Sequence, residues 1–340
     1  MGVHLAPLIS KQIVNLQNLR GHSFAVDGNN VLYQFLALIR LPDGRPLTSQ
    51  TGRVTSHLVG LLFRTVRLIS DYDMSLVFTF DGRPHERKRE ELKTRRATRL
   101  KAAREYAEAV ERQDYATAWS KAVASSWLTQ DLVMDAQRLL DLLGIPWVQA
   151  PGEGEAQAAF ICSRGEVWAS ATRDYDALLY GSPRLLRYLT ISGREFLPSK
   201  GTSRPLEPEL IRLDDFLGTL QLTQEQLIDL AILVGTDYNR GVRGIGPHKA
   251  LNLLQQYGCL ENLPSELTDR LPSDFADIRD LFLHPAVTKD YHIQPGGIDR
   301  DGLMEFLCEE RDFSRRRVGK ALGRLEKLGS HPSLAEFGDV

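Results

Sequence analysis

The chain has 340 residues, enough for one large domain or two modest ones. Hydrophobic residues make up 42% of it and charged residues 25%, with a formal net charge of −2, as in an ordinary globular protein. No apolar stretch approaches the ~20 residues that a membrane-spanning helix needs, which excludes that class of membrane protein. The three cysteines are too scattered for a metal-binding motif, so we expect reduced thiols in a cytosol-like compartment.

Apolar periodicity predicts strands that alternate with helices in the first two-thirds of the chain. The expected strands lie at about 22–27, 75–80, 145–148, 167–172 and 185–189. The expected helices follow the first strand, cover about 55–69, 84–125 and 128–143, and follow Pro151-Gly152. A loop is expected over 194–206, and further helices at about 222–234, 247–256, 302–308 and 314–328. This alternation predicts an α/β fold with a central, mainly parallel sheet flanked by helices.

Seven acidic residues stand where a strand is expected to end or a helix to begin. They are Asp27, Asp81, Glu153, Glu155, Asp174, Asp176 and Asp237. An open α/β sheet binds its ligands at the carboxyl ends of its strands. Acids gathered there repel one another unless a hard cation lies between them, and their oxygens suit Mg²⁺, with Mn²⁺ as a substitute. So many ligands would hold two cations about 4 Å apart, the arrangement found in phosphodiester hydrolases.

Each of these acids taken alone has a simpler interpretation, as a helix N-cap or a solvated turn residue. That interpretation explains the whole set less well, because Glu153-Gly-Glu155 and Asp174-Tyr-Asp176 place two acids at each of two sites. A helix start needs only one capping side chain. The sequence therefore predicts a metal-dependent enzyme.

The segment from Arg83 to Arg104 is strongly basic, with ten Lys or Arg residues and only three acids. The simpler interpretation is a solvated surface helix with ion pairs at i,i+4, but three acids cannot pair with ten cations. Unpaired positive charge of this density indicates a polyanionic partner, and nucleic-acid phosphate is the natural candidate. A Lys or Arg beside the metals would also stabilise charge that develops on a scissile phosphate.

A glycine-rich hairpin precedes the helix expected at about 247–256. It reads Gly241-Val-Arg-Gly244-Ile-Gly246-Pro247-His248-Lys249, with the proline suited to the first position of a helix. Its exposed N–H groups would bind one phosphate. A nucleotide-binding loop is the competing interpretation, but the preceding strand and the Gly-Lys-Ser/Thr ending are missing. A helix–hairpin–helix that grips a DNA backbone without reading its sequence fits better.

Over roughly residues 1–260 the sequence resembles the flap endonuclease family of structure-specific 5′ nucleases, the XPG-type nucleases, and its archaeal members in particular. The motifs that carry the resemblance are Met1-Gly2-Val-His-Leu-Ala-Pro-Leu-Ile, Asp27-Gly-Asn-Asn-Val-Leu-Tyr33, Phe80-Asp81-Gly, Ala150-Pro-Gly-Glu153-Gly-Glu155-Ala-Gln-Ala-Ala, Thr172-Arg-Asp174-Tyr-Asp176 and Gly235-Thr-Asp237-Tyr-Asn. They stand in the family's order along the chain.

The resemblance implies a single nuclease domain over 1–340. The implied parts are an N-terminal nuclease region (about 1–105) with a helical arch (about 84–130), an internal nuclease region (about 125–260) with the helix–hairpin–helix (about 225–257), a helical portion (260–328) and a tail (329–340). It also implies a 5′ flap endonuclease with 5′–3′ exonuclease activity that cuts DNA at single-strand/double-strand junctions. Its roles would be replication (Okazaki fragment maturation) and repair, and its products a 5′-phosphate and a 3′-hydroxyl.

The resemblance further implies roles for individual residues. The seven acids would hold two Mg²⁺ ions, and Lys88 and Arg95 would reach from the arch to the scissile phosphate. Tyr33 would stack on a base beside the cut. Gly2, once the initiator methionine is removed, would place the amino terminus near the active site. The arch would accept only a free 5′ end.

At the hairpin, Gly244, Gly246 and Lys249 would hold the duplex backbone together with a monovalent cation, K⁺. The family often has a basic residue where His248 stands, which would weaken the grip on duplex at neutral pH. Members of this type commonly end in a motif that binds a sliding clamp. Here the tail keeps only part of that motif, with His331, Leu334 and Phe337 at its spacing, and a disordered terminal tail is the other interpretation.

Other functions stay open at this point. They are a junction-resolving or repair nuclease of the same superfamily, a non-catalytic DNA-binding scaffold, and an RNA-directed nuclease of similar topology. The compact arch between Asp81 and Glu153 argues against a repair nuclease with a long spacer, the seven intact acids against the scaffold, and the duplex hairpin against RNA. We expect a cytoplasmic, nucleoid-associated protein if the chain is archaeal, and a nuclear one if it is eukaryotic.

Overall fold

The fold is that of a computed structural model, in which residues 2–191, 193–197 and 202–329 are described. Its central sheet has seven strands in the order β1-β9-β6-β5-β2-β3-β4. They are β1 (Gln12–Ile13), β2 (Ser23–Asp27), β3 (Ser75–Phe80), β4 (Trp147–Gln149), β5 (Ala169–Ala171), β6 (Arg184–Arg187) and β9 (Glu209–Arg212). The strands from β6 to β4 run parallel, whereas β9 is antiparallel to both β6 and β1. The predicted α/β fold with a mainly parallel sheet is therefore confirmed.

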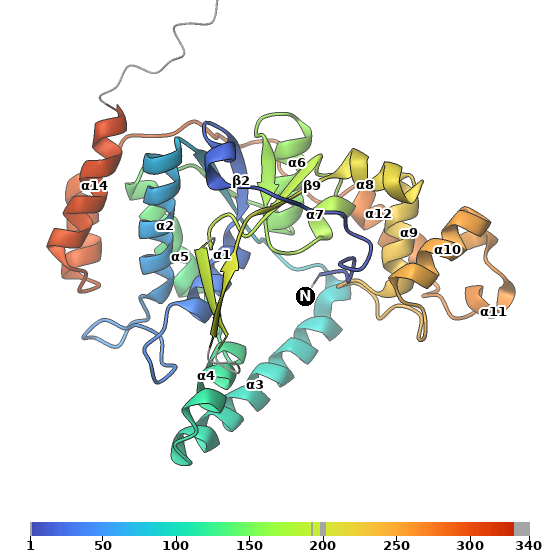
Figure 1. The fold of residues 1–340 in the computed structure, drawn as a ribbon, viewed down its shortest axis with the longest axis horizontal. Helices are drawn as coiled ribbons and strands as arrows, with labels where there is room; N and C mark the ends of the chain where they lie inside the picture. Colours follow the sequence, from blue (N-terminus) through green and yellow to red (C-terminus); the bar gives the residue numbers. More distant parts are fainter. Residues whose placement is uncertain (1, 192, 198–201, 330–340) are drawn as a thin grey trace, which may run out of the picture.

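Alternate residues of a strand point to opposite faces of the sheet, and each face has its own helices. The helices concerned are α1 (Gly28–Leu38), α2 (Ser56–Tyr72), α5 (Gln130–Leu142), α6 (Gly154–Ser163) and α14 (Arg315–Gly329). Phe24 and Val26 of β2 point into a core shared with α1, α2, α5 and α14, which gather at one end of the molecule (Figure 1). Ala25, between them, packs on the opposite face against α6. The sheet is thus buried on both faces, as parallel sheets usually are.

A second core fills the other end of the molecule, opposite α14 (Figure 1). Its helices are α7 (Asp176–Leu179), α8 (Leu213–Leu220), α9 (Gln224–Val234), α10 (Pro247–Tyr257), α11 (Ser265–Thr268) and α12 (Phe275–Leu283). A capping box between Thr223 and Gln226 starts α9, and Gly246 with Pro247 starts α10. With the glycine hairpin between them, α9 and α10 form the predicted helix–hairpin–helix.

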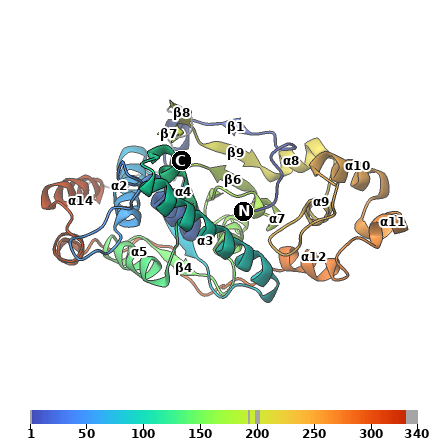
Figure 2. The same cartoon turned by 90° about the horizontal axis from the view of Figure 1, so that it is seen from below.

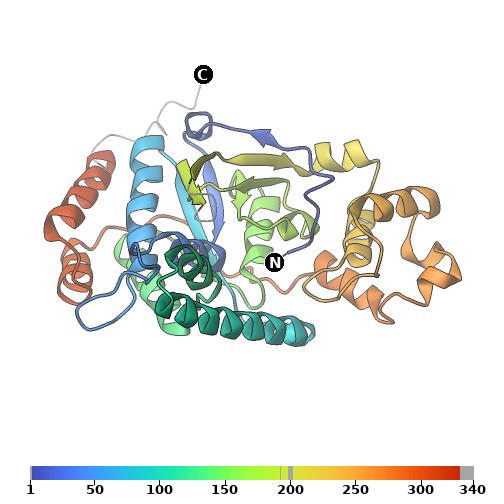
Figure 3. The ribbon, with the colours of Figure 1, turned by 60° about the horizontal axis from the view of Figure 1, so that its bottom comes forward.

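The basic segment forms the predicted arch, as two packed helices. Its parts are η2 (Glu86–Lys88), α3 (Arg89–Glu111) and α4 (Tyr115–Ala124). Gln113, with a φ of 58°, turns the chain between the two helices, and Asp114 caps α4. Buried alanines on both helices let them pack closely. Figures 2 and 3 show α3 as a long rod that runs from the α12 side of the molecule to α4, past the N-terminal segment.

The expectation of a loop over 194–206 is wrong. β7 (Gly193–Leu197) and β8 (Thr202–Leu206) pair with each other as an antiparallel, two-stranded sheet. Residues typical of turns dominate the composition of this stretch and hide the strands. The two strands are held by hydrogen bonds to each other's backbone, and a pattern of apolar residues does not show such pairing. The remaining short elements are η1 (Leu16–Leu19), η4 (Leu260–Asn262), α13 (Arg300–Met304) and the π-helical η5 (Glu305–Glu309). In the described ranges no helix has the length and apolarity needed to cross a bilayer.

Candidate active site

The register of the sheet brings the predicted acids to one edge. β2 pairs in parallel with both β3 and β5, so Asp27 at the end of β2 lies beside the segments that follow those strands. Asp81 and Asp174 stand in these segments. The other four acids come from helix ends at the same edge, and they are Glu153, Glu155, Asp176 and Asp237. Electrostatic repulsion connects all seven through neighbouring pairs: Asp81 repels Glu153 and Asp27, Asp174 repels Asp27, Glu155 and Asp176, and Asp176 repels Glu155 and Asp237. We call this set the acid cluster.

Hydrogen-bond donors hold the carboxylates of the acid cluster in place. The Asn30 backbone N–H donates to Asp27 over 3.0 Å, and the Thr172 hydroxyl donates to the same carboxylate over 3.2 Å. The backbone N–H of Gly154 donates to Asp81 over 2.7 Å. Two more backbone N–H groups also donate to the cluster, that of Val3 to Asp176 (2.6 Å) and that of Ala177 to Glu155 (2.9 Å). The side-chain amide of Asn30 donates to Asp174 (3.1 Å). The carboxylates are therefore positioned by the backbone as well as by their own strands and helices.

Burial and mutual repulsion disfavour the charged form of several of these acids. Burial, followed by repulsion from Asp81, raises the pKa of Asp27 to about 8. Burial and the neighbouring Asp237 raise the pKa of Asp176 to about 7. The pKa of Glu155 is also raised well above its usual value, by burial and by Asp176. The acid cluster thus holds more negative charge than its surroundings stabilise.

Two cationic side chains of the arch reach into the acid cluster. The Lys88 Nζ lies 2.7 Å from the Glu153 carboxylate and 3.2 Å from that of Asp237. Arg95, on α3, lies 2.9 Å from Asp237 and also pairs with Glu91. Burial alone would lower the pKa of Lys88, but the attraction of Glu153 and Asp237 raises it, so the ammonium stays charged. Both cations named from the sequence therefore lie on the acid cluster.

An aromatic residue that the sequence analysis did not single out supports this contact. The ring centroid of Tyr238 lies 5.3 Å from Lys88 Nζ, and its hydroxyl lies 3.1 Å from that of Tyr180. Aromatic ring faces attract ammonium groups. Tyr238 therefore helps to hold Lys88 against the carboxylates. In the sequence, only the position of Tyr238 directly after Asp237 pointed to this role.

The chemistry of the donor set fits divalent cations. Seven carboxylates meet two cationic side chains, so five negative charges are left without a partner of opposite sign when all seven are ionised. In the described part of the chain, no three carboxylate, imidazole or thiol groups already converge as a complete ligand set; each carboxylate is turned toward one of the donors above. Hard oxygen ligands in excess over nearby cations are what Mg²⁺ and Mn²⁺ bind.

We expect the metal-free protein to lose stability as the pH rises from about 4 to about 8. The unfolded chain releases the protons of Asp27 and Asp176 near pH 4, whereas the folded chain holds them up to about pH 8 and about pH 7. Folding therefore takes up protons in this window, and a rise in pH favours the unfolded state. Magnesium is expected to oppose the loss because it binds the ionised acids of the folded state.

Thermal unfolding in EDTA and in magnesium, each at about pH 5 and about pH 8, measures this effect. The expected result is a transition temperature in EDTA that is several degrees lower at the higher pH and is restored by magnesium. Equal transition temperatures in all four conditions would contradict an acid cluster formed before the metal binds.

A buried arginine outside the predicted set positions part of the acid cluster. Arg187, at the end of β6, donates to the backbone carbonyl of Arg173 over 2.7 Å and to the Tyr175 hydroxyl over 2.6 Å. It also pairs with Glu209 of β9 over 2.6 Å, and both side chains are only 9% exposed. These contacts hold the residues on either side of Asp174. Its only sequence signal was a charge at the end of an apolar strand.

Arg187→Lys keeps the charge but loses the planar fork that contacts several partners at once. Groups that orient metal ligands typically change metal affinity 10–100-fold, so we expect the apparent Kd for Mg²⁺ to rise about tenfold. A magnesium titration followed by calorimetry measures it. Arg184→Lys is the matched control, because Arg184 lies on the same strand but contacts Trp168 instead of the acids. If both variants bind magnesium equally well, Arg187 does not position the acid cluster.

Two further predicted residues lie against the acid cluster and the arch. A side chain at Gly2 would collide with the Asp176 carboxylate, so the start of the described chain lies directly on the cluster. Tyr33, on α1, lies under the Arg99 guanidinium of α3, with 5.0 Å between the Arg99 Cζ and the ring centroid. Gly2 therefore lies at the acid cluster, and Tyr33 lies against the arch.

The glycine hairpin joins α9 to α10 at the end of the molecule opposite α14 (Figure 1). Gly244 has a φ of +82°, a conformation that glycine adopts without strain. Val242 and Ile245 are buried and anchor the hairpin in the second core. Gly244, Gly246 and Lys249 are exposed, so the hairpin backbone is accessible to a partner. The tail residues predicted to bind a clamp, His331, Leu334 and Phe337, lie outside the described residues.

Comparison with known proteins agrees with this site. The XPG N-terminal domain matches residues 1–102, and the XPG I-region matches 144–237. Flap endonuclease 1 of Staphylothermus marinus is 46% identical over 333 residues, which cover 96% of this chain and 95% of that protein. The solved flap endonuclease-1 from Methanococcus jannaschii has a TM-score of 0.76 and 38% identity, covering 96% of this chain and 98% of that one.

A more distant structure, the catalytic core of Rad2 in complex with a DNA substrate, shares the fold with a TM-score of 0.70 at 24% identity, over 95% of this chain and 100% of that one. The near relatives align along almost the whole chain, and this aligned length spans the acid cluster, the arch and the hairpin of the present protein. The resemblance first seen in the motifs is therefore confirmed, and the chain belongs to the flap endonuclease 1 family of XPG-type nucleases.

Proposed function

We propose that this chain is a divalent-metal-dependent 5′ flap endonuclease with 5′–3′ exonuclease activity, acting on DNA in replication (Okazaki fragment maturation) and repair. The observation that carries the proposal is the contact of Lys88 and Arg95 with the acid cluster. A phosphodiester is an anion and approaches a set of carboxylates only where cations face it. The two arch cations supply such a face, directly beside the predicted metal ligands.

The tasks of these residues follow from their charges. The acid cluster would hold two Mg²⁺ ions, for which Mn²⁺ can substitute, and when bound these ions supply a hydroxide nucleophile and stabilise the leaving oxygen. Lys88 and Arg95 exchange their carboxylate partners for the oxygens of the scissile phosphate and stabilise the charge that develops on them. Tyr238 keeps the Lys88 ammonium in place during this exchange.

We further propose that the arch selects the substrate. Arg87, at its start, pairs with Asp274 and Asp277 next to and within α12, while α4 at its other end contacts α1. The arch is thereby tied to both ends of the molecule across the acid cluster. A strand that reaches the carboxylates must pass next to α3, which favours a free, unpaired 5′ end over a continuous duplex.

The helix–hairpin–helix is proposed to hold the duplex. The N-terminus of α10 begins at Gly246 with Pro247, and its first N–H groups suit a backbone phosphate. Lys249 on the first turn adds a positive charge, and K⁺ bound to the hairpin backbone would add another. Because none of these groups reads a base edge, this grip is independent of sequence.

Two further proposals rest on the family alone. The tail residues His331, Leu334 and Phe337 would bind a sliding clamp through a degenerate motif. The relatives reported above with an organism are archaeal, so we place the protein in the cytoplasm with the nucleoid.

A cleavage assay with three end-labelled DNAs tests the proposed function: a 5′ flap, a 3′ flap and a four-way junction, each with magnesium and with EDTA. The expected result is magnesium-dependent cutting at the base of the 5′ flap alone. Symmetric cutting of the four-way junction would favour a junction-resolving nuclease instead. Binding of all three DNAs without any cutting would favour a non-catalytic scaffold.

A further inference from the structure

An arginine of the arch lies over two aromatic rings at once. Arg99 Cζ is 5.0 Å from the ring centroid of Tyr33 and 5.4 Å from that of Trp127. The three residues come from three places, α1 (Tyr33), α3 (Arg99) and the link between α4 and α5 (Trp127). Among the described residues the Arg99 side chain has no carboxylate partner and no hydrogen bond. The two rings are therefore its main contacts.

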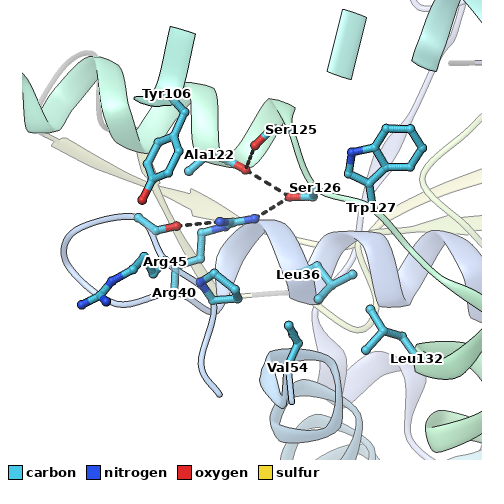
Figure 4. A pocket seen from close by; sticks show the side chains of 12 residues that line it. Leu36, Arg40, Arg45, Val54, Tyr106, Ala122, Ser125, Ser126, Trp127 and Leu132 are labelled. Carbon is cyan, nitrogen blue, oxygen red and sulfur yellow. Dashed lines mark hydrogen bonds between the residues drawn. The ribbon is translucent and has the colours of Figure 1, made fainter. Parts of the chain in front are cut away.

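Trp127 is not placed to fill a core. Its side chain is 41% exposed, although tryptophan carries a large apolar surface. It lines a cavity of about 240 Å³ at the base of the arch, together with Leu36, Arg40 and Tyr106 (Figure 4). The arch helices already pack on each other through buried alanines. The exposed part of the ring is thus accessible to a ligand.

The two rings lie close to the acid cluster. Arg99 is one helical turn beyond Arg95 on α3, which is about 6 Å along the helix axis. Arg95 itself contacts Asp237 of the acid cluster. Successive nucleotides of a strand are about 3.4 Å apart when stacked, so the rise between Arg95 and Arg99 along α3 corresponds to about two nucleotides.

We propose that Tyr33 and Trp127 form a two-ring slot for one unpaired base of the 5′ strand, and that Arg99 occupies this slot until DNA binds. The proposal rests on the proposed function, and it adds Trp127 as a binding residue and Arg99 as the exchanged group. A guanidinium is planar and stacks on aromatic rings as a base does. Stacking of a base on an aromatic ring is stronger than an exposed cation–π contact, so the base displaces Arg99.

The exchange would also give selectivity for unpaired DNA. A base inside a duplex has both faces covered by its neighbours, whereas an unpaired base can offer a face to each ring. Arg99, once displaced, carries its charge on the same strand and can pair with one of its phosphates. Binding of the correct strand therefore replaces two weak contacts by base stacking and an ion pair.

The test places 2-aminopurine, an adenine analogue whose fluorescence is quenched by stacking, at the first unpaired nucleotide of a 5′ flap. Quenching and affinity are measured in EDTA for the wild type and for Trp127→Ala, Trp127→Leu and Trp127→Phe. Tyr115→Ala is the matched control, because Tyr115 is an aromatic residue of the arch that is 61% exposed and begins α4, whereas Trp127 follows the end of that helix.

Trp127→Ala and Trp127→Leu are expected to lose most of the quenching and to bind flap DNA about tenfold more weakly, the usual effect of removing one base–aromatic stack. Trp127→Phe keeps a ring and is expected to retain both properties, as is Tyr115→Ala. A nicked duplex without a flap is expected to bind all variants within about twofold, because it offers no unpaired base to the slot.

Two outcomes would overturn the slot. One is wild-type quenching and affinity in Trp127→Leu, which would show that the side chain only packs. The other is an equal loss of affinity for flap and nicked DNA. Cleavage of a 5′ flap by the wild type with magnesium is measured in parallel. If the wild type cuts the flap while either outcome holds, the slot alone is wrong; if it does not cut, the proposed function is wrong.

Discussion

Asp27→Asn is expected to abolish cleavage of a 5′ flap and, in the same protein, to stabilise the metal-free state. The amide keeps the shape of the side chain and can still accept the Asn30 N–H, but it removes one negative charge from the acid cluster. Loss of a single electrostatic group in an active site commonly lowers the rate 10²–10³-fold, and here a proposed metal ligand is lost too, so we expect a drop of at least about 10³-fold.

The gain in stability has a separate cause. Asp27 is only 6% exposed, and burial with repulsion by Asp81 raises its pKa to about 8. Near pH 8 the aspartate is therefore ionised at a cost that the amide does not have, and we expect the free energy of unfolding in EDTA to increase by roughly 1–3 kcal/mol. Thermal unfolding and single-turnover cleavage measure the two effects on one sample.

Asp73→Asn is the matched control for Asp27→Asn. It makes the same chemical change at the exposed C-cap of α2, where the backbone is left-handed and asparagine is well tolerated. Both its activity and its stability are expected to stay at the wild-type level. If Asp27→Asn loses activity together with stability, the loss reflects damage to the fold, and the assignment of Asp27 to the metals would be contradicted.

Lys88→Met is expected to slow the chemical step by about 10²–10³-fold, because it removes a positive charge from the place where charge develops on the phosphate. The Lys88 side chain is only 12% exposed. Methionine has a similar length and keeps the apolar contacts of the lysine stem. Single-turnover rates at saturating enzyme separate the chemical step from DNA binding. Affinity for flap DNA in EDTA is expected to change only a few-fold.

Lys93→Met is the control for this substitution. Lys93 belongs to the same arch, but it is 73% exposed and pairs with Glu90 on its own helix. A surface pair of this kind contributes little, so the chemical step is expected to stay within about twofold of the wild type. Equal single-turnover rates for Lys88→Met and Lys93→Met would remove Lys88 from the catalytic step.

The strands and helices that carry the acids were predictable because each has a clear local signal. The runs that end in Asp27 and Asp81 are short, apolar and rich in β-branched or aromatic residues, and the structure has β2 and β3 there. The hairpin of β7 and β8 was missed because its strands are held by each other and carry turn residues at their ends. Local propensity does not show such pairing.

The supporting residues of the site were missed for a related reason. Arg187 matters because β6 and β9 are neighbours in the sheet, which brings Glu209 to within 2.6 Å of it. Trp127 matters because the arch returns to α1, where Tyr33 and Arg99 meet it. Neither residue belongs to a motif, and each looks like an ordinary strand or loop residue until its neighbours are known.

By itself, the sequence determined the chemistry of this protein: an excess of carboxylates at strand ends, a basic helical segment and a glycine hairpin, in the order typical of one nuclease family. Only the tertiary structure decided which charges meet. Lys88 and Glu153 are 65 residues apart in the chain, and Val3 and Asp176 are 173 apart. Such contacts depend on strand order, parallel register and the path of the arch, which are properties of the packed chain. The residue types that do the chemistry are local, so they can be recognised in the sequence one segment at a time.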